Sequence, residues 1–82
     1  MKKYEDLLQT LKNIQSSGMI VTSEEAAIEY QDMIGHSTEE QLEELSNSEY
    51  KEAFYRLYDV AFGPIQMMRF YARHATKIRE LY

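Results

Sequence analysis

The chain contains few of the residues that separate the strands of a sheet, with one proline and three glycines among 82 residues. Its apolar residues instead recur every three or four positions, which is the spacing of one face of an α-helix. Residues 4–14 show this spacing, with Tyr4, three leucines and Ile14 on one face. We therefore predict an all-α fold, a small bundle of four to five helices with no sheet, forming a single domain over residues 1–82.

Local signals indicate where the helices begin and end. The run Ser16-Ser17-Gly18 ends the first helix, and its glycine suits a left-handed turn. Thr22 and Glu25 form a capping-box pattern at the start of a second helix, which reaches Ile34. Ser37-Thr38-Glu39-Glu40 repeats the pattern and starts a short third helix. These signals are local, so they predict helix ends without reference to the rest of the fold.

Two connections need a separate interpretation. Met19-Ile20-Val21 is apolar but has no evident partner strand, so we predict a buried link. Gly63-Pro64 separates two long helical patterns, and proline is tolerated in the first turn of a helix but breaks its interior. We therefore predict a corner, with Pro64 near the start of the last helix. The apolar stripe before this corner consists of Tyr50, Phe54, Leu57, Tyr58 and Ala61.

Charge and aromatic residues are unevenly distributed. Residues 1–52 carry four lysines against twelve acids, a balance of −8, whereas residues 53–82 carry five cations against two acids, a balance of +3. Eight of the ten aromatic residues lie at or beyond position 50. An acidic segment is thus followed by an aromatic, cationic one, and the net charge of −5 disfavours a general affinity for nucleic acid or anionic lipid.

Several residue types and sequence patterns are absent from the chain, and their absence limits the kinds of protein it can be. The chain has no cysteine, which excludes disulfides, thiolate metal sites and cysteine nucleophiles. It has no run resembling a signal peptide and no stretch near the ~18 apolar residues that span a bilayer. We therefore expect a soluble intracellular protein.

The sequence offers no recognisable catalytic set. His36 and His74 are the only histidines, and neither lies in a pattern with a nucleophile. We expect His36 to be a loop or capping residue and His74 to be a structural or surface residue. Calcium-loop spacing and Glu-x-x-His are absent. We predict that the protein is not an enzyme and has no catalytic residue, no cofactor and no metal.

An acidic cluster comprises Glu39, Glu40, Glu43 and Glu44. It is either a solvated helix face or a surface that binds a cation or a basic partner, or that imitates the phosphates of a nucleic acid. Segment 22–45 has the scale of a helix-turn-helix, but its second helix would place four negative charges against DNA. DNA reading by this segment is therefore excluded.

The last helix carries two apolar faces. We expect the core stripe to be Ile65, Met68, Ala72, Ala75, Ile78 and Tyr82. The candidate partner-binding surface lies beside it and comprises Met67, Arg69, Phe70, Tyr71, Arg73 and Lys77. Methionines, aromatics and arginine are typical of interface centres. Two alternatives to a partner-binding surface stay open. Its cations are used in pairs with acidic residues of the same chain, or its apolar side chains are buried because other helices of the bundle surround the last helix.

The whole chain resembles the RIII family of cytoplasmic antiholins of T-even bacteriophages. The resemblance rests on the opening Met1-Lys2-Lys3-Tyr4-Glu5-Asp6-Leu7-Leu8, the total length, and the closing Ile78-Arg79-Glu80-Leu81-Tyr82. It implies a small soluble protein in the host cytoplasm that helps hold back host lysis. Such a protein would bind the cytoplasmic N-terminal part of the phage holin, alongside a separate periplasmic antiholin.

The residues and the resemblance together predict a non-enzymatic inhibitor that sequesters its target stoichiometrically and blocks its assembly. Binding unchanged by joint charge reversal of Arg69 and Arg73 would count against the proposed surface. Two other functions remain possible. An acidic nucleic-acid mimic would use the glutamates of residues 39–49, and a small structural homo-oligomer would use the aromatic helix for self-assembly.

Overall fold

The computed structural model describes residues 3–79, and the side chains of residues 3–74. It contains five helices: α1 (Lys3–Ser17), α2 (Glu24–Gly35), α3 (Glu39–Ser46), α4 (Lys51–Phe62) and α5 (Pro64–Arg79). No strand occurs in the described ranges, so the prediction of an all-α bundle is confirmed. Within residues 3–79, none of the helices has the length and apolar character needed to cross a membrane.

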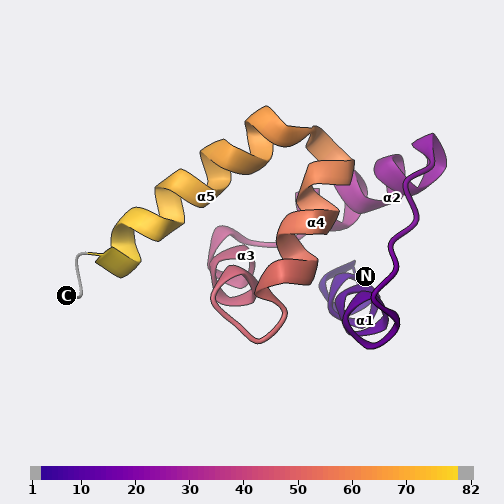
Figure 1. Cartoon of the computed structure of the whole chain (residues 1–82), viewed down its shortest axis with the longest axis horizontal. Coiled ribbons are helices and arrows are strands. Elements are labelled where there is room, and N and C mark those ends of the chain that lie inside the picture. The colour runs from indigo at the N-terminus through magenta and orange to yellow at the C-terminus, as the bar shows by residue number, and fades with distance from the viewer. Residues whose placement is uncertain (1–2, 80–82) are drawn as a thin grey trace.

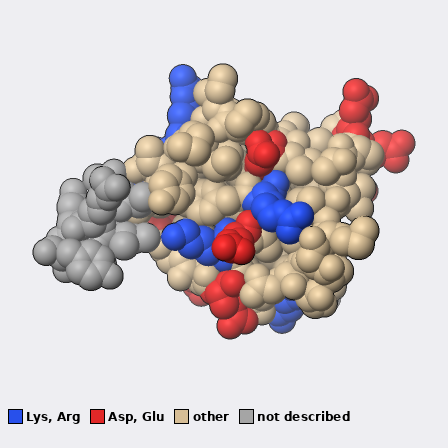
Figure 2. Space-filling view, in the orientation of Figure 1, with Lys and Arg blue, Asp and Glu red and all other residues tan. Residues whose placement is uncertain are grey.

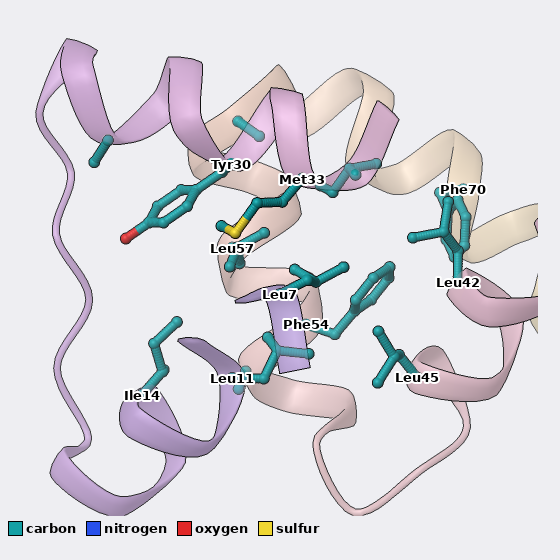
Figure 3. Packing of buried hydrophobic residues seen from close by; sticks show 14 residues of the cluster. Leu7, Leu11, Ile14, Tyr30, Met33, Leu42, Leu45, Phe54, Leu57 and Phe70 are labelled. Atoms are coloured by element: carbon teal, nitrogen blue, oxygen red, sulfur yellow. The ribbon is translucent and has the colours of Figure 1, made fainter. Parts of the chain in front are cut away.

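Helix α4 is the centre of the bundle, because it contacts α1, α2, α3 and α5 (Figure 1). The side chains of Phe54 and Leu57, on α4, are fully buried. Around them, apolar residues from all five helices form one cluster (Figure 3). The cluster consists of Leu7, Leu11, Ile14, Ala26, Tyr30, Met33, Ile34, Leu42, Leu45, Ala53, Phe54, Leu57, Ala61 and Phe70.

The capped helix starts lie one residue later than predicted. Ser23, rather than Thr22, caps α2, and its hydroxyl accepts a hydrogen bond from the backbone N–H of Ala26 at 3.1 Å. Thr38 caps α3 in a reciprocal capping box with Gln41, at 3.1 and 2.9 Å. Each segment offers two consecutive hydroxyl residues, and in both segments the second one is the cap.

The link between α1 and α2 is not buried, so that prediction is wrong. Met19 and Val21 are 76% and 61% exposed, and Ile20 is half-buried. A connecting segment runs over the surface because its backbone polar groups need water. Gly18 does adopt the predicted left-handed turn, with φ +73°, and its N–H donates to the carbonyl of Ile14 at 2.7 Å.

The chain turns a corner between α4 and α5, as predicted (Figure 1). Gly63 has φ +90° and ψ 167°, a region open only to glycine, and Pro64 is the first residue of α5. The N–H of Gly63 donates to the carbonyl of Asp59 at 2.7 Å, while its own carbonyl accepts from Met67 at 3.1 Å. Gly63 therefore completes both helices and sets the direction in which α5 leaves α4.

Candidate functional site

Helix α5 turns one of its two apolar faces into the core. Phe70 is 1% exposed and His74 is 4% exposed, whereas Ile65 and Met68 are 70% and 55% exposed. Ala72 is also exposed. The prediction that these three residues belong to the core stripe is therefore wrong. The stripe's other residues fall outside the described side chains: Ala75, Ile78 and Tyr82.

Aromatic rings on α4 explain this orientation. The ring centroid of Phe70 lies 5.4 Å from that of Phe54, 5.0 Å from that of Tyr58 and 4.1 Å from that of His74. Each aromatic pair contributes about 0.5–1.5 kcal/mol beyond the burial of its area. Figure 3 shows Phe70 of α5 facing the buried side chains of the central helix. An aliphatic stripe offers no such ring contacts, so the aromatic face of α5 packs inward.

The six predicted partner-binding residues do not share one surface. Phe70 is a core residue and not a surface contact, because its ring is buried against α4. Met67 and Tyr71 lie on the flank of α5 beside Tyr55, whereas Arg69 and Arg73 line a different depression. The side chain of Lys77 lies outside the described residues.

Arg69 and Arg73 lie on the flank of α5 that carries Gln66, next to Tyr58 of α4. Arg73 Nη2 is 3.9 Å from Oε1 of Glu39, and Arg73 Cζ is 5.5 Å from the centre of the Phe70 ring. Both members of the Arg73–Glu39 pair are well exposed, so the pair contributes at most about 1 kcal/mol. Arg73 thus pairs with the chain's own acidic segment. Basic and acidic side chains lie next to each other near the centre of the view in Figure 2.

An open groove runs between α4 and α5 on the other flank. It encloses about 410 Å³ and is lined by Lys51, Glu52, Tyr55, Arg56, Met67, Met68 and Tyr71. The rings of Tyr55 and Tyr71 meet edge to face, with centroids 5.4 Å apart. Beside them, two methionines supply a polarisable surface that adapts to different shapes. We call this feature the α4–α5 groove.

The charged residues of the groove come from α4. Lys51 Nζ lies 5.9 Å from the centre of the Tyr71 ring, within range of a cation–π attraction. Arg56 donates from Nη1 to the backbone carbonyl of Gly18 at 3.3 Å. Burial raises the pKa of Tyr55 above its ordinary value of 10.0. The groove is thus an apolar, aromatic surface with cations at its edge.

The sequence-based candidates did not include Lys51, Tyr55 and Arg56. Tyr55 is an aromatic residue that stands just off the core stripe of α4, which is a signal that a second face of this helix is apolar. Lys51 and Tyr55 are four residues apart and so share a helix face. Both observations could be made from the sequence alone. The position of Met67 beside Lys51 and Tyr55, however, depends on the corner at Gly63.

His74 is buried between two carboxylates of α3. Its Nε2 lies 3.5 Å from Oε1 of Glu39, and its Nδ1 lies 3.4 Å from Oε2 of Glu43. Neither ring nitrogen makes a hydrogen bond of good geometry. The side chain is 5% exposed and stacks on Phe70, so His74 occupies a structural position where α5 meets α3.

His36 follows the last residue of α2 and caps it, which confirms its prediction as a loop or capping residue. Its Nδ1 lies 2.8 Å from the carbonyl and 3.2 Å from the carboxylate of Asp32. Lys3 Nζ lies 2.6 Å from the same carboxylate, and its hydrogen bond lowers the pKa of Asp32. This exposed cluster ties the start of α1 to the end of α2.

The acidic helix α3 presents part of its charge to solvent. Glu40, Glu43 and Glu44 line a surface depression together with Asn47. Two acids of α3 contact α5: Glu39 contacts Arg73 and His74, and Glu43 contacts His74 as well. Among the described residues, no group of three potential metal-binding side chains comes together.

The fold and the groove define a small all-α bundle with an open apolar surface between its last two helices. No protein-family model, curated protein or solved structure matches the chain. Function is therefore inferred from the chemistry of the groove and from the sequence.

Proposed function

We propose that this protein is a non-enzymatic inhibitor of the antiholin kind, acting in the host cytoplasm. It would bind the cytoplasmic N-terminal part of a phage holin and prevent the holin from assembling. The observation that carries the protein-binding part of this proposal is the exposed apolar α4–α5 groove. The antiholin part rests on the resemblance of the whole chain to that family.

The groove has the composition of a protein-binding surface. Met68 is 55% exposed and Tyr71 is 40% exposed, and both lie beside the half-buried Tyr55 and Met67. Contiguous exposed apolar side chains with a polar rim are typical of protein interaction sites. Tyrosine and methionine are enriched at the centres of such sites. A monomer gains nothing in stability by keeping these side chains in water.

Sequestration would require no chemistry at the groove. A bound target segment would cover the tyrosine and methionine side chains and would lose the surface through which it joins other copies of the target. Each inhibitor would then neutralise one target molecule, so inhibition would depend on the ratio of the two proteins. Assembly would resume once the target exceeded the inhibitor.

The test uses the purified full chain and a fluorescent peptide comprising the cytoplasmic N-terminal segment of the holin. Saturable one-to-one binding, measured by anisotropy, is expected for the unmodified chain. Met68→Glu places a charge on the groove and should weaken binding by about tenfold or more. Ile28→Glu is the matched control, because Ile28 is 65% exposed on α2 and does not line the groove. No binding of the unmodified chain up to about 1 mM peptide would overturn the antiholin proposal.

Nucleic-acid mimicry by the acidic helix has weaker support. A mimic needs its carboxylates free to face a basic partner, whereas Glu39 contacts Arg73 and His74 within the chain. Joint substitution of Glu40 and Glu44 by glutamine should therefore leave binding of the holin segment unchanged. Loss of that binding in the double variant would redirect the function to α3.

A further inference from the structure

We infer that the α4–α5 groove takes one face of an acidic amphipathic helix. Apolar side chains of that helix would pack against Tyr55, Met68 and Tyr71, and its carboxylates would lie against Lys51 and Arg56. The inference deepens the proposed function, because it rests on a protein partner binding at the same groove, but it specifies the chemistry of the partner without using the holin's identity.

The dimensions of the groove set how much of a partner it can hold. Its walls are residues 51–56 of α4 and residues 67–71 of α5. At 1.5 Å per residue, the α5 wall is about 6 Å long, slightly more than one helical turn. A groove of that length takes two apolar side chains one turn apart, at positions i and i+3 or i+4 of a helix. An extended strand would run past the groove after two residues.

The charges at the rim favour a partner that carries acids. Elsewhere in the bundle, Lys3 lies 2.6 Å from Asp32 and Arg73 lies 3.9 Å from Glu39. Within the described part of the chain, neither Lys51 nor Arg56 has such an acidic partner. The lining of the groove contains two cations and one acid, Glu52, in a protein whose net charge is −5.

Each cation makes a contact within the chain that is not an ion pair. Arg56 donates to the carbonyl of Gly18, and Lys51 lies over the ring of Tyr71. Cations that are already positioned lose less side-chain entropy when a carboxylate binds, which favours an ion pair with a partner. The rim therefore selects for acids close to the apolar residues of the bound helix.

A second copy of this chain fits the groove less well. Two copies related by a two-fold axis would present the same surface patch to each other. Each patch would bring two cations and one acid, Glu52, so both of the paired surfaces would carry a net positive charge. Like charges brought together across an interface suppress that pairing. An acidic helix meets the same rim with attraction instead.

The decisive experiment uses the full chain and two synthetic helical peptides with the same leucines at i, i+3, i+4 and i+7. One peptide carries glutamates beside the leucines and the other carries lysines. The glutamate peptide should bind at least about tenfold more tightly, since it forms ion pairs where the lysine peptide meets like charges. Its affinity should fall as NaCl rises from about 50 mM to about 300 mM.

Charge reversal of the rim provides the matched test. The double variant Lys51→Glu with Arg56→Glu should reverse the preference, so that the lysine peptide binds more tightly than the glutamate peptide. Lys12→Glu with Arg69→Glu changes the net charge equally but leaves the rim intact, and should keep the original preference. Both double variants should retain the helical circular dichroism of the parent, since all four residues are exposed.

The outcomes separate this inference from the proposed function. Equal affinity for the two peptides, or a preference that survives reversal of the rim, would overturn the acidic-helix assignment. A stable dimer that dissociates on Met68→Glu would also overturn it and assign the groove to a second copy. Tight binding of the glutamate peptide without binding of the holin segment would support the inference and overturn the antiholin proposal. Binding of the holin segment that is unchanged by charge reversal of the rim and by Met68→Glu would support the antiholin proposal and overturn the inference.

Discussion

The imidazole Nδ1 of His74, on α5, lies 3.4 Å from the carboxylate of Glu43, on α3. This approach joins the last helix to the acidic helix, and it does so with a side chain that is almost fully buried. Phe70 lies one turn before His74 and stacks on its ring. The two residues together anchor the described part of α5 to the rest of the bundle.

Replacing His74 by alanine should destabilise the fold. The change removes a buried ring and leaves a cavity beside Phe70, which should lower the free energy of unfolding by about 2–4 kcal/mol. Urea unfolding followed by circular dichroism measures this value. Arg73→Ala is the control, because Arg73 is exposed and its loss should cost less than about 1 kcal/mol. Equal unfolding midpoints for the two variants would contradict the burial of His74.

Phe70→Ala tests which face of α5 is inward. Removing this fully buried ring should cost about 3–5 kcal/mol, whereas Met68→Ala at an exposed position should change stability by about 0.5 kcal/mol or less. Thermal or urea unfolding of the two variants checks the difference. The reverse order of costs would mean that the stripe of Ile65 and Met68 faces the core after all.

Gly63→Ala tests the corner between α4 and α5. A Cβ at this position meets nothing within 4 Å, so the cost comes from the backbone conformation, at about 1–3 kcal/mol. Gly35→Ala is a matched control, since its added Cβ also meets nothing but its φ is not positive. That variant should gain up to about 1 kcal/mol, because alanine favours a helix over glycine. Opposite signs in urea unfolding are the expected result.

Substitution of Thr38 by alanine tests the observed start of α3. The change removes the acceptor for the N–H of Gln41 and should cost about 0.5–2 kcal/mol. Ser23→Ala should have a similar effect at α2. Thr22→Ala is the discriminating control, and it should be nearly neutral. A larger cost at Thr22 than at Ser23 would restore the capping box predicted from the sequence.

Alkaline pH should destabilise the protein through tyrosines that are buried or half-buried in the folded state. Burial raises the pKa of Tyr30, Tyr55 and Tyr58 above 10.0 in the folded state. The unfolded chain then loses protons first, so the stabilisation is complete below about pH 10 and is lost as the pH rises through the folded pKa values. Thermal unfolding between about pH 8 and pH 11 should show this fall, and Tyr55→Phe should reduce its steepness.

Spectroscopic titration of the folded protein gives an independent check of those pKa values. Tyrosinate absorbance of Tyr30, Tyr55 and Tyr58 should develop above pH 10, at higher pH than in the denatured chain. A folded-state titration that coincides with that of the denatured chain would contradict the assigned burial. The expected loss of stability at alkaline pH would then need another source.

Local sequence signals predicted some helix boundaries to the residue and others only approximately. The left-handed turn at Gly18 and the corner at Gly63-Pro64 were predictable, because each depends on the backbone freedom of one or two residues. The caps were predictable only to within one residue. Thr22 and Ser23 both carry a hydroxyl that can cap a helix, and the structure places Ser23 at that position in the helix that buries Tyr30 and Met33.

The candidate site was predicted only in part. Met67 and Tyr71 were correctly placed outside the core of α5, and both line the groove. Phe70 was assigned to the same surface because it shares their flank on a helical projection, yet it is buried against Phe54. The α4 side of the groove was missed, since no pattern in the sequence says which helix faces which.

The amino-acid sequence by itself determined an all-α fold of four to five helices, the corner at Gly63-Pro64 before the last helix and the concentration of aromatic residues near the C-terminus. These features follow from periodicity, capping residues and backbone freedom, all of which act over a few residues. The tertiary structure decided which face of α5 is buried. Both faces are apolar, and the aromatic face packs inward because Phe54 and Tyr58 on α4 offer rings for it to contact. That choice left Met68 and Tyr71 exposed and thereby created the groove.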